Sequence, residues 1–456
     1  MQFVGPIVGE VTETSARVVV QPDRLGQVTV VLSSAAGAAL SASALATADK
    51  PVVGVLVSGL SPATVYALSV LLDGIPVPGR VGRVVTRTPG IEQLTVAAVS
   101  CNFTVRQGES RLWSQLLTEQ VQPGNVSTVL HIGDQVYADT AFGQSMHDAK
   151  SGRTQAVFDA IAARFRRLYE YTWNYEATRQ VLATTSNLMI WDDHEVRNGW
   201  GSHGADRDPT SNEAWVGGIA RRVFQDFQRQ LWTAPDLNAD HEAHAHVYGG
   251  VGIVFLDQRG CRTFDYDPTL PYLGAKQWAW LRGTLASAAF ASVKALVVIT
   301  SVPLLYVGEA VAAAAGLVAS DLRDQWSYPG HRAEQLQLVD LLVQWKAGAA
   351  GREVSVVGGD VHVGGQTVLE AVGPHGAWQP AFRQFITSPI TNSPPGALAF
   401  FGIKSVLLGS THDLDARFRY RHESLTPRRN YAVLTLRGPN VGAASIAGSL
   451  TEDAQD

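Results

Sequence analysis

Short runs of strongly apolar residues, each followed directly by polar residues, are the feature that most constrains the fold of this chain. From about residue 90 onward, these runs alternate with longer stretches that have an amphipathic helical pattern. The runs cover residues 94–99, 129–132, 188–191, 251–256, 295–300 and 354–357. Strands that are apolar throughout are typical of a sheet buried on both faces, with helices between the strands in sequence. The pattern therefore predicts a layered α/β domain.

Two of the intervening stretches show a helical period. Val157, Ile161, Phe165 and Leu168 recur at intervals of four, four and three residues, which places them on one face of a helix. The stretch 335–345 has the same spacing of apolar residues. We therefore expect helices over both stretches.

The first 89 residues have a different pattern, with short segments rich in Val, Leu and Thr between turn residues. These segments cover residues 16–21, 27–33, 52–57, 66–72 and 81–87. Short strands at this spacing predict a β-sandwich. The run 59–66 resembles the start of a strand in a fibronectin III-like domain, where a tyrosine, here Tyr66, packs at a corner. We expect a fibronectin III-like β-sandwich domain over residues 1–89 and a second domain over residues 90–456.

Composition limits the partners of this chain. Its 456 residues are enough for two domains, and 46% of them are hydrophobic, which allows a large core. The 36 basic and 41 acidic side chains give a net charge of −5, so no basic excess exists to neutralise nucleic acid phosphates. An obligate nucleic acid partner is therefore not expected. A small phosphorylated substrate is still compatible with this charge, because a bound metal can supply a local positive site.

Cysteine content and the N-terminus bear on compartment. Two cysteines, Cys101 and Cys261, are too few for a disulfide framework. Residues 1–6 lack the basic and apolar regions of a signal peptide, and no run approaches the roughly 20 apolar residues of a membrane span. We expect a cytoplasmic protein without a membrane span; the sequence does not determine its oligomeric state.

Polar side chains follow four of the apolar runs at the point where each predicted strand ends. In an open α/β sheet, sites form beyond the carboxyl ends of the strands. A glycine–aspartate pair after a strand is usually only a turn, and a lone cysteine is usually a small core residue. The joint occurrence of Cys, Asp, Tyr and His at four strand ends instead predicts a metal site with several ligands. The predicted ligands are Cys101, Asp134, Tyr137, Asp193, Asp360 and His362.

The segments that carry these residues resemble the alkaline phosphatase D (PhoD-like) family of metallophosphoesterases. The matching motifs are Ser100-Cys101, Gly133-Asp134-Gln135-Val136-Tyr137, Trp191-Asp192-Asp193-His194-Glu195-Val196, Asp257-x-Arg259 with Arg262, and Gly359-Asp360-Val361-His362. They span residues of about 95 to 365. The resemblance implies a layered αββα metallophosphoesterase-type catalytic domain after the β-sandwich, and a phosphoric ester hydrolase that acts on a small phosphoester.

Departures from the broader metallophosphoesterase pattern bear on the metals. Ser100-Cys101-Asn102 replaces the usual Asp-x-His, and Gly359-Asp360-Val361-His362 replaces Gly-His-x-His. A thiolate and a phenolate beside carboxylates favour Fe³⁺, and an oxygen-rich neighbouring site favours Ca²⁺ or another hard ion. The resemblance likewise implies an iron–calcium centre. Mg²⁺, Mn²⁺ or Zn²⁺ remains an alternative as the divalent ion, and zinc at both positions is disfavoured.

A mechanism follows from these charges. Asp134 would bridge two ions that hold a hydroxide for in-line attack at phosphorus. His194 would stabilise the phosphoryl oxygen or protonate the leaving group, and Arg259 would bind the phosphate. An ion pair of Arg259 with Asp257 or Asp265 is the alternative for that residue. Further candidates for substrate binding are Arg197, Asn198 and Arg262.

Several alternatives remain open at the level of sequence. The motifs do not distinguish a phosphatase from a phosphodiesterase, because the loops at 205–212 and 311–326 would shape the leaving-group side. The chain could instead be a non-catalytic β-sandwich binding or adhesion protein with a degenerate metal domain, or a metal-dependent hydrolase of another ester. The histidines of the run 241–246 are interpreted as solvated loop residues, and Cys261 as a bystander.

Overall fold

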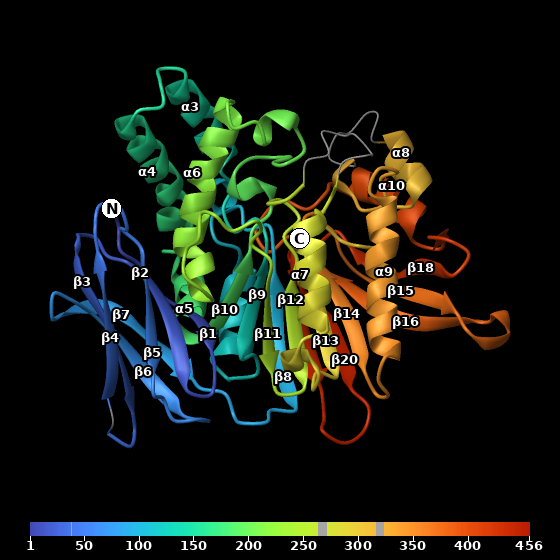
Figure 1. Cartoon of the computed structure of the whole chain (residues 1–456), viewed down its shortest axis with the longest axis horizontal. Coiled ribbons are helices and arrows are strands. Elements are labelled where there is room, and N and C mark those ends of the chain that lie inside the picture. Colours follow the sequence, from blue (N-terminus) through green and yellow to red (C-terminus); the bar gives the residue numbers. More distant parts are fainter. Residues whose placement is uncertain (38, 263–270, 316–322) are drawn as a thin grey trace.

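Seven strands at the N-terminus form two antiparallel sheets that face each other (Figure 1). The computed structural model describes residues 1–37, 39–262, 271–315 and 323–456. The two sheets have the orders β1-β2-β5 and β4-β3-β6-β7 and share one apolar core. The strands are β1 (Val4–Val11), β2 (Ser15–Gln21), β3 (Gly26–Ser34), β4 (Ala39–Ala46), β5 (Val53–Ser58), β6 (Val65–Leu72) and β7 (Ile75–Val85).

The sequence predicted five of these strands and missed β1 and β4. Strand β4 consists of alanine, serine and leucine only, and alanine is depleted in strands. Strand β1 contains Gly5, Pro6 and Gly9, which are weak strand formers. The predicted tyrosine corner is present, because the buried Tyr66 hydroxyl accepts a hydrogen bond from the Ser61 N–H at 2.8 Å.

Two further sheets make up the rest of the molecule. The five-stranded sheet has the order β10-β9-β8-β19-β20, and β8, β9 and β10 run parallel. Its strands are β8 (Gln93–Val99), β9 (Thr128–Ile132), β10 (Ser186–Ile190), β19 (Asn430–Arg437) and β20 (Ser445–Glu452). The eight-stranded sheet has the order β11-β12-β13-β14-β16-β15-β18-β17. Its strands are β11 (His244–Tyr248), β12 (Val251–Phe255), β13 (Ala295–Thr300), β14 (Glu353–Gly358), β15 (Gly364–Val372), β16 (Trp378–Ile386), β17 (Thr411–Asp413) and β18 (Phe418–Thr426).

These two sheets share one apolar core, because side chains of both belong to a single buried cluster. Leu130 and Leu188 come from the five-stranded sheet, and Ile253 and Val297 from the eight-stranded sheet. The six apolar runs of the sequence therefore all lie in strands, as predicted. An apolar run with no alternation is what a strand between a second sheet and a helix layer requires.

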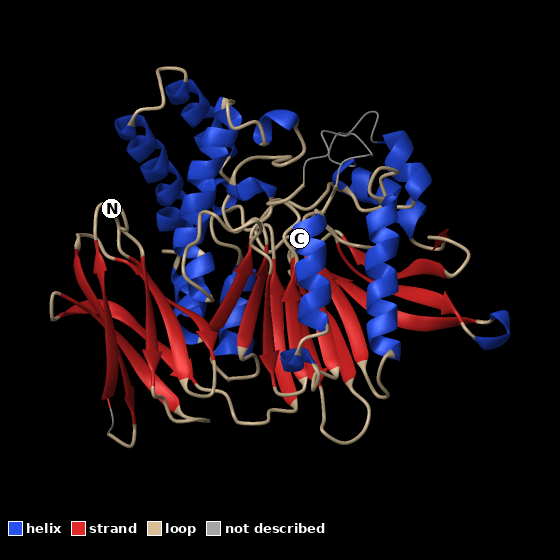
Figure 2. Cartoon of the chain, viewed as in Figure 1, coloured by secondary structure: helices blue, strands red, loops and turns tan. Residues whose placement is uncertain are grey.

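Helices occupy the outer faces of both sheets (Figure 2). Helices α2 (Arg111–Gln115) and α5 (Glu176–Thr184) pack on β8 and β9 through Leu112 and Val181. Helices α7 (Ala275–Leu285) and α9 (Arg332–Ala347) pack on the eight-stranded sheet through Leu281 and Leu342. The remaining α-helices are α1 (Thr104–Gln107), α3 (Asp139–Ala149), α4 (Gln155–Thr172), α6 (Asn212–Phe227), α8 (Glu309–Ala315) and α10 (Ala397–Leu407). The two predicted helices are present as α4 and α9.

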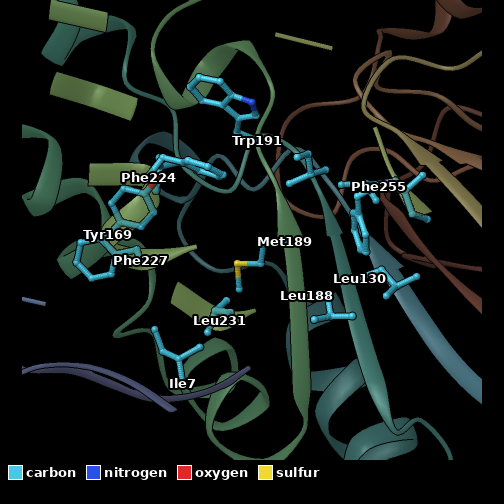
Figure 3. Close-up of a cluster of buried hydrophobic side chains, with 14 of the residues drawn as sticks. Ile7, Leu130, Tyr169, Leu188, Met189, Trp191, Phe224, Phe227, Leu231 and Phe255 are labelled. Carbon is cyan, nitrogen blue, oxygen red and sulfur yellow. The ribbon is translucent and has the colours of Figure 1, made fainter. Parts of the chain in front are cut away.

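The β-sandwich packs directly against the second part of the chain. Ile7 of β1 belongs to the same buried cluster as Leu188, Phe227 and Leu231, and Figure 3 shows it below Leu231 and Met189. Asn187 donates a hydrogen bond from Nδ2 to the Val8 carbonyl oxygen at 3.0 Å. A shared core of this kind couples the stability of the two parts.

The prediction for two histidines of the run 241–246 is wrong. His244 and His246 were expected in a solvated loop, but they are buried on strand β11 at the edge of the eight-stranded sheet. His244 Nδ1 lies 2.8 Å from His246 Nε2, and His246 Nδ1 lies 2.7 Å from Glu10 Oε1. Burial lowers the pKa of His244 well below its ordinary value. The alternation of His244, His246 and Tyr248 with smaller residues is a strand period, which the polar residues before it obscured.

The two segments predicted as loops on the leaving-group side, 205–212 and 311–326, are partly helical in the described part of the chain. Residues 205–212 include part of a short 3₁₀ helix (Gly204–Asp206) and the start of α6. The segment 311–326 begins in α8, and its residues 316–322 lie outside the described part of the chain. Among the described residues, no helix is long and apolar enough to cross a membrane.

Candidate metal centre

Three strand ends from the two larger sheets meet and bring four acidic side chains together. Asp134 follows β9, Asp192 and Asp193 follow β10, and Asp360 follows β14 of the other sheet. One carboxylate oxygen from each of these four residues lies within 4.8 Å of the other three. His194 joins Asp134 and Asp193 in a second group with the same limit. The sequence predicted this convergence, but it did not single out Asp192.

The backbone at these strand ends adopts an uncommon conformation. Cys101, Asp134, Asp360 and His362 have φ angles of 55°, 56°, 62° and 54°. The left-handed region costs non-glycine residues about 1 kcal/mol or more, and such strain gathers at functional sites. Gly133 is required for a further reason, since a Cβ there would lie 2.5 Å from the Asp192 Cβ. The turn after each strand is therefore shaped to aim its side chain at the centre.

Buried Glu195 fixes two of these turns at once. Its Oε2 accepts hydrogen bonds from the backbone N–H groups of Asp134 at 3.0 Å and Asp192 at 2.8 Å. Its Oε1 accepts from the Gln135 N–H at 2.8 Å. No role for Glu195 was predicted from the sequence. The spacing Asp192-x-x-Glu195 is nevertheless that of a capping box, and the structure contains this capping box.

Cys101, Tyr137 and His362 form one side of the centre. Cys101 Sγ lies 3.5 Å from Asp134 Oδ2, and Tyr137 Oη lies 3.2 Å from the same oxygen. Tyr137 Oη also lies 3.4 Å from His362 Nε2. Asn392 donates from Nδ2 to Tyr137 Oη at 2.9 Å, so it orients the phenol. Asn392 follows β16 in a loop without a recognisable pattern, and the sequence offered no signal for it.

The chemistry of the cluster fits a cation. Burial, aided by Asp193 and Asp192, raises the pKa of Asp134 well above its usual range. Burial also raises the pKa of Asp360, and the same two neighbours add to that shift. Among the described residues, neither Asp192 Oδ2 nor Asp193 Oδ1 accepts a hydrogen bond, and the ion-pair partner of Asp193 Oδ1, Arg259, lies at 3.6 Å. Because buried carboxylate oxygens without a hydrogen bond are costly, these atoms are suited to a metal ion, which would reverse the mutual repulsion.

Burial raises the pKa of the Cys101 thiol and of the Tyr137 hydroxyl as well, with Asp134 adding to both shifts. Each group would be neutral without a cation. A metal ion deprotonates a coordinating thiol, so metal binding at these two residues would release protons. The donor set of carboxylates, a thiol, a phenol and His362 is compatible with the ions that the sequence favoured.

His194 is held by an acid that sequence analysis did not single out. His194 Nδ1 lies 2.7 Å from Asp139 Oδ2, at the start of α3. Burial lowers the pKa of His194, but Asp193, Asp134 and Asp139 together outweigh burial and raise this pKa well above its ordinary value. The contact with Asp139 leaves Nε2 as the ring nitrogen available to a reacting group.

Arg259 has a different position from the one expected of a phosphate-binding cation. Its side chain is 1% exposed and forms ion pairs with Asp192 and, at 3.0 Å, with Asp324. Arg259 is thus in ion pairs, as the alternative expected, but not with Asp257, whose Oδ1 accepts a hydrogen bond from the Arg259 backbone N–H at 2.9 Å. Asp265 lies outside the described residues. Long-range packing of three loops decides this pairing, which local sequence cannot predict.

The three candidates for substrate binding are placed differently from one another. Arg197 pairs with Asp206. Arg262 is fully buried and pairs with Asp324 at 2.8 Å. Asn198 lines the cavity above the acidic cluster, and its backbone N–H donates to Asp139 Oδ1 at 2.8 Å. Asn198 is therefore the candidate that reaches the site directly.

A cavity of about 470 Å³ lies over the cluster. Its polar side contains four carboxylates, two histidines, an asparagine and a glutamine. The described residues that line it include no lysine or arginine. A cavity of this size accepts a small molecule, but an anion would be repelled there unless cations were bound at the carboxylates.

Comparison with known proteins places the chain in a family. The family model described as PhoD-like phosphatase matches residues 96–400, which is more than half of the sequence. The chain belongs to the PhoD-like phosphatase family. The family model described as a domain of unknown function, DUF7800, matches residues 2–86. The resemblance inferred from the strand-end motifs is thus confirmed.

A solved structure supports the fold of this PhoD-like chain. The structure described as that of PhoD superposes with a TM-score of 0.70 at 17% identity, covering 98% of this chain and 89% of that chain. A sensor domain of the anti-sigma factor RsgI4 from Pseudobacteroides cellulosolvens matches 19% of this chain and 94% of that one, at 18% identity and a TM-score of 0.16. At this TM-score the match gives no information about the fold of this chain. No match was found among curated proteins.

Family and fold together support a phosphoric ester hydrolase with a metal requirement. The family match and the convergence of Asp134, Asp192, Asp193 and Asp360 argue against the non-catalytic alternative.

Proposed function

We propose that this protein hydrolyses small phosphate esters by metal-assisted attack of water at phosphorus. The observation that carries the proposal is the cavity, which combines four carboxylates with no described lysine or arginine. Such a cavity can hold a phosphate only after cations have bound, and the family match supplies the reaction class. Fe³⁺ with Ca²⁺ is the pair that the donor set favours.

Seven residues would hold the metals. Six of them are the ligands predicted from the sequence, and the seventh is Asp192, which lies beside Asp134, Asp193 and Asp360. Cys101, Tyr137 and Asp134 offer a thiolate, a phenolate and a carboxylate, with Cys101 Sγ 3.5 Å and Tyr137 Oη 3.2 Å from Asp134 Oδ2. Asp193, Asp360 and His362 complete the predicted set. Bound there, the ions would act as Lewis acids and lower the pKa of a coordinated water. Glu195 would keep the Asp134 and Asp192 turns in register with each other.

His194 and Asn198 would act on the substrate. His194 lines the cavity and is held by Asp139, so its Nε2–H would donate to a phosphoryl oxygen or to the leaving group. Arg259 would act as a positioning residue that holds Asp192 through an ion pair; burial raises the pKa of Asp192, and Arg259 opposes that shift. Arg197 and Arg262 would support Asp206 and Asp324 in the same way.

The domain boundary and the layering belong to the same proposal. The match to the DUF7800 model ends at residue 86, and the match to the PhoD-like phosphatase model begins at residue 96. This supports a division between residues 89 and 90. Two sheets around one core, with helices on their outer faces, support the αββα layering expected of a metallophosphoesterase.

The direct test combines metal analysis with hydrolysis. The protein is stripped with a chelator, reloaded with Fe³⁺ and Ca²⁺ or with other divalent ions, and assayed on a chromogenic monoester and a diester. We expect at least about one metal atom per chain and activity only in the loaded protein. Lack of bound metal and of activity after reloading would support the binding-protein alternative.

Two substitutions test the assignment of ligands. Asp134→Asn is expected to lower kcat by roughly 10³-fold, and Cys101→Ala is expected to remove the iron and its ligand-to-metal absorption while the circular dichroism spectrum is kept. Cys261→Ala is the matched control, because the Cys261 thiol donates to the Asp240 carbonyl oxygen and Cys261 is not among the described residues that line the cavity. Full activity and iron content in Cys101→Ala would exclude the thiolate ligand.

A further inference from the structure

The cavity over the acidic cluster has a second side that is chemically unlike the first. The polar side carries Asp134, Asp193, His194 and their neighbours. The same cavity is also lined by aliphatic and aromatic groups, which are Tyr306, Val307, Val311, Ile403, Val406 and Leu407. Val361, placed in sequence between the predicted ligands Asp360 and His362, lines the same cavity. An apolar wall therefore continues directly from the candidate metal centre.

Two stretches that are distant in sequence, residues 306–311 and 403–407, build this apolar wall. Tyr306 and Val307 follow strand β13, and Val311 comes from α8. The other three residues come from α10, which lies much later in the sequence. Tyr306, Val307 and Leu407 belong to one buried apolar cluster, against which Val311, Val361 and Ile403 pack. The wall is thus a packed extension of the core, and separate segments converge to form it.

The wall offers little to a polar group. Among its six residues only Tyr306 has a side-chain hydrogen-bonding group, so a sugar or a nucleobase would leave most of its donors and acceptors unsatisfied there. A hydrocarbon group would instead remove apolar surface from water, with a gain of about 0.8 kcal/mol for each buried methylene. Val406 is still 43% exposed and would lose that exposure when such a group binds.

We propose that the alcohol part of the phosphate ester is apolar, an alkyl or aryl group that lies against this wall while the phosphate faces the acidic cluster. The inference rests on the proposed function, because it takes the cluster as the place of the phosphate. It adds the substrate class that the ligand residues alone leave open.

A homologous series of substrates tests the inference. The n-alkyl phosphates from methyl to hexyl have nearly equal leaving-group chemistry, so differences in kcat/KM report the fit of the chain. They are assayed as monoesters, or as methyl alkyl diesters if the enzyme takes only diesters. We expect kcat/KM to rise by roughly threefold to fourfold per methylene until the cavity is filled.

Variants of α10 locate the effect. Ile403→Ser and Val406→Ser are expected to flatten the rise of kcat/KM with chain length, with the largest loss for the longest esters. Phe401→Ser is the matched control, since Phe401 lies on the same helix, is 69% exposed and does not line the cavity. It is expected to keep the parental slope.

Binding of n-alkylphosphonates to the metal-loaded protein gives a readout that does not need turnover. Their affinity is expected to rise with chain length, with a heat capacity change that becomes more negative. Hydrolysis of all esters with equal kcat/KM and equal phosphonate affinities would overturn the inference and leave the proposed function standing. Absence of hydrolysis throughout would count against the proposed function, and the phosphonate series would still decide whether the wall binds hydrocarbon.

Discussion

At the scale of single residues, the candidate centre depends on acids that hold other groups in place. Asp139 contacts His194 Nδ1 and also accepts from the Asn198 N–H, so one carboxylate orients two residues that line the cavity. Glu195 does the same for the turns that carry Asp134 and Asp192. Such outer partners commonly affect metal sites by 10- to 100-fold when they are removed.

Asp139→Asn is therefore expected to lower kcat by roughly 10- to 100-fold with a smaller change in KM, because an amide can leave His194 with the wrong tautomer facing the cavity. Steady-state kinetics on a chromogenic ester measure both constants. Asp148→Asn is the control, since Asp148 lies on the same helix but pairs with Arg164. An unchanged kcat in Asp139→Asn would exclude the orienting role.

Arg259 shows how a buried cation supports its neighbours. It is 1% exposed and pairs with Asp192 and Asp324. Arg259→Met would leave both carboxylates buried without this partner and is expected to lower the free energy of unfolding by about 3 to 5 kcal/mol. Denaturant unfolding measures the change. Arg417→Met, which removes an exposed pair with Asp340, is expected to have no measurable effect; equal effects of both variants would contradict the prediction.

At the scale of elements, α6 carries an unfavourable acid in its last turn. Asp226 is 7% exposed, and burial raises its pKa from 3.8 to about 7 although Arg222 and Arg166 oppose that shift. A negative charge near a helix C-terminus is also unfavourable. Because the folded state binds this proton more tightly than the unfolded chain, the contribution of Asp226 to stability falls as the pH rises from about 4 to about 7.

Asp226→Asn removes this titration. The variant is expected to be more stable than the parent at pH 8, by up to roughly 2 to 4 kcal/mol, and close to the parent at pH 4. Thermal unfolding at both pH values measures the difference. A stability difference that does not depend on pH would show that Asp226 ionises normally in the folded protein.

At the scale of the whole molecule, the β-sandwich and the larger part of the chain share one core. Gly9 of β1 lies so close to the second part that an added Cβ would be 2.2 Å from the Leu231 carbonyl oxygen. The backbone atoms there cannot move aside without opening the contact. The two parts are therefore expected to unfold in a single transition.

Gly9→Ala tests this contact. It is expected to lower the stability of the whole protein by about 1 to 3 kcal/mol, seen as a downward shift of the single melting transition. Gly218→Ala in α6 is the control, because an added Cβ meets nothing within 4 Å there and alanine favours a helix. Two separate transitions in Gly9→Ala would show that the parts fold independently.

What the sequence by itself determined is a part of the elements and the strand ends at which the chemistry lies. Period and composition predicted strands β8, β9, β10, β12, β13 and β14, five strands of the β-sandwich and helices α4 and α9, because each depends on neighbours in sequence. The polar residues after β8, β9, β10 and β14 predicted the metal centre, because parallel strands deliver their ends to one edge. The family followed from the same motifs.

Tertiary structure decided which groups meet across that edge. The pairing of Arg259 with Asp192 and Asp324, and the support of Tyr137 by Asn392, join segments far apart in sequence. The burial of His244 and His246 depends on a neighbouring strand and on Glu10 of the β-sandwich. The apolar wall of the cavity likewise exists only once α8 and α10 pack beside the centre. Burial and partner choice are properties of the packed chain, and local pattern does not contain them.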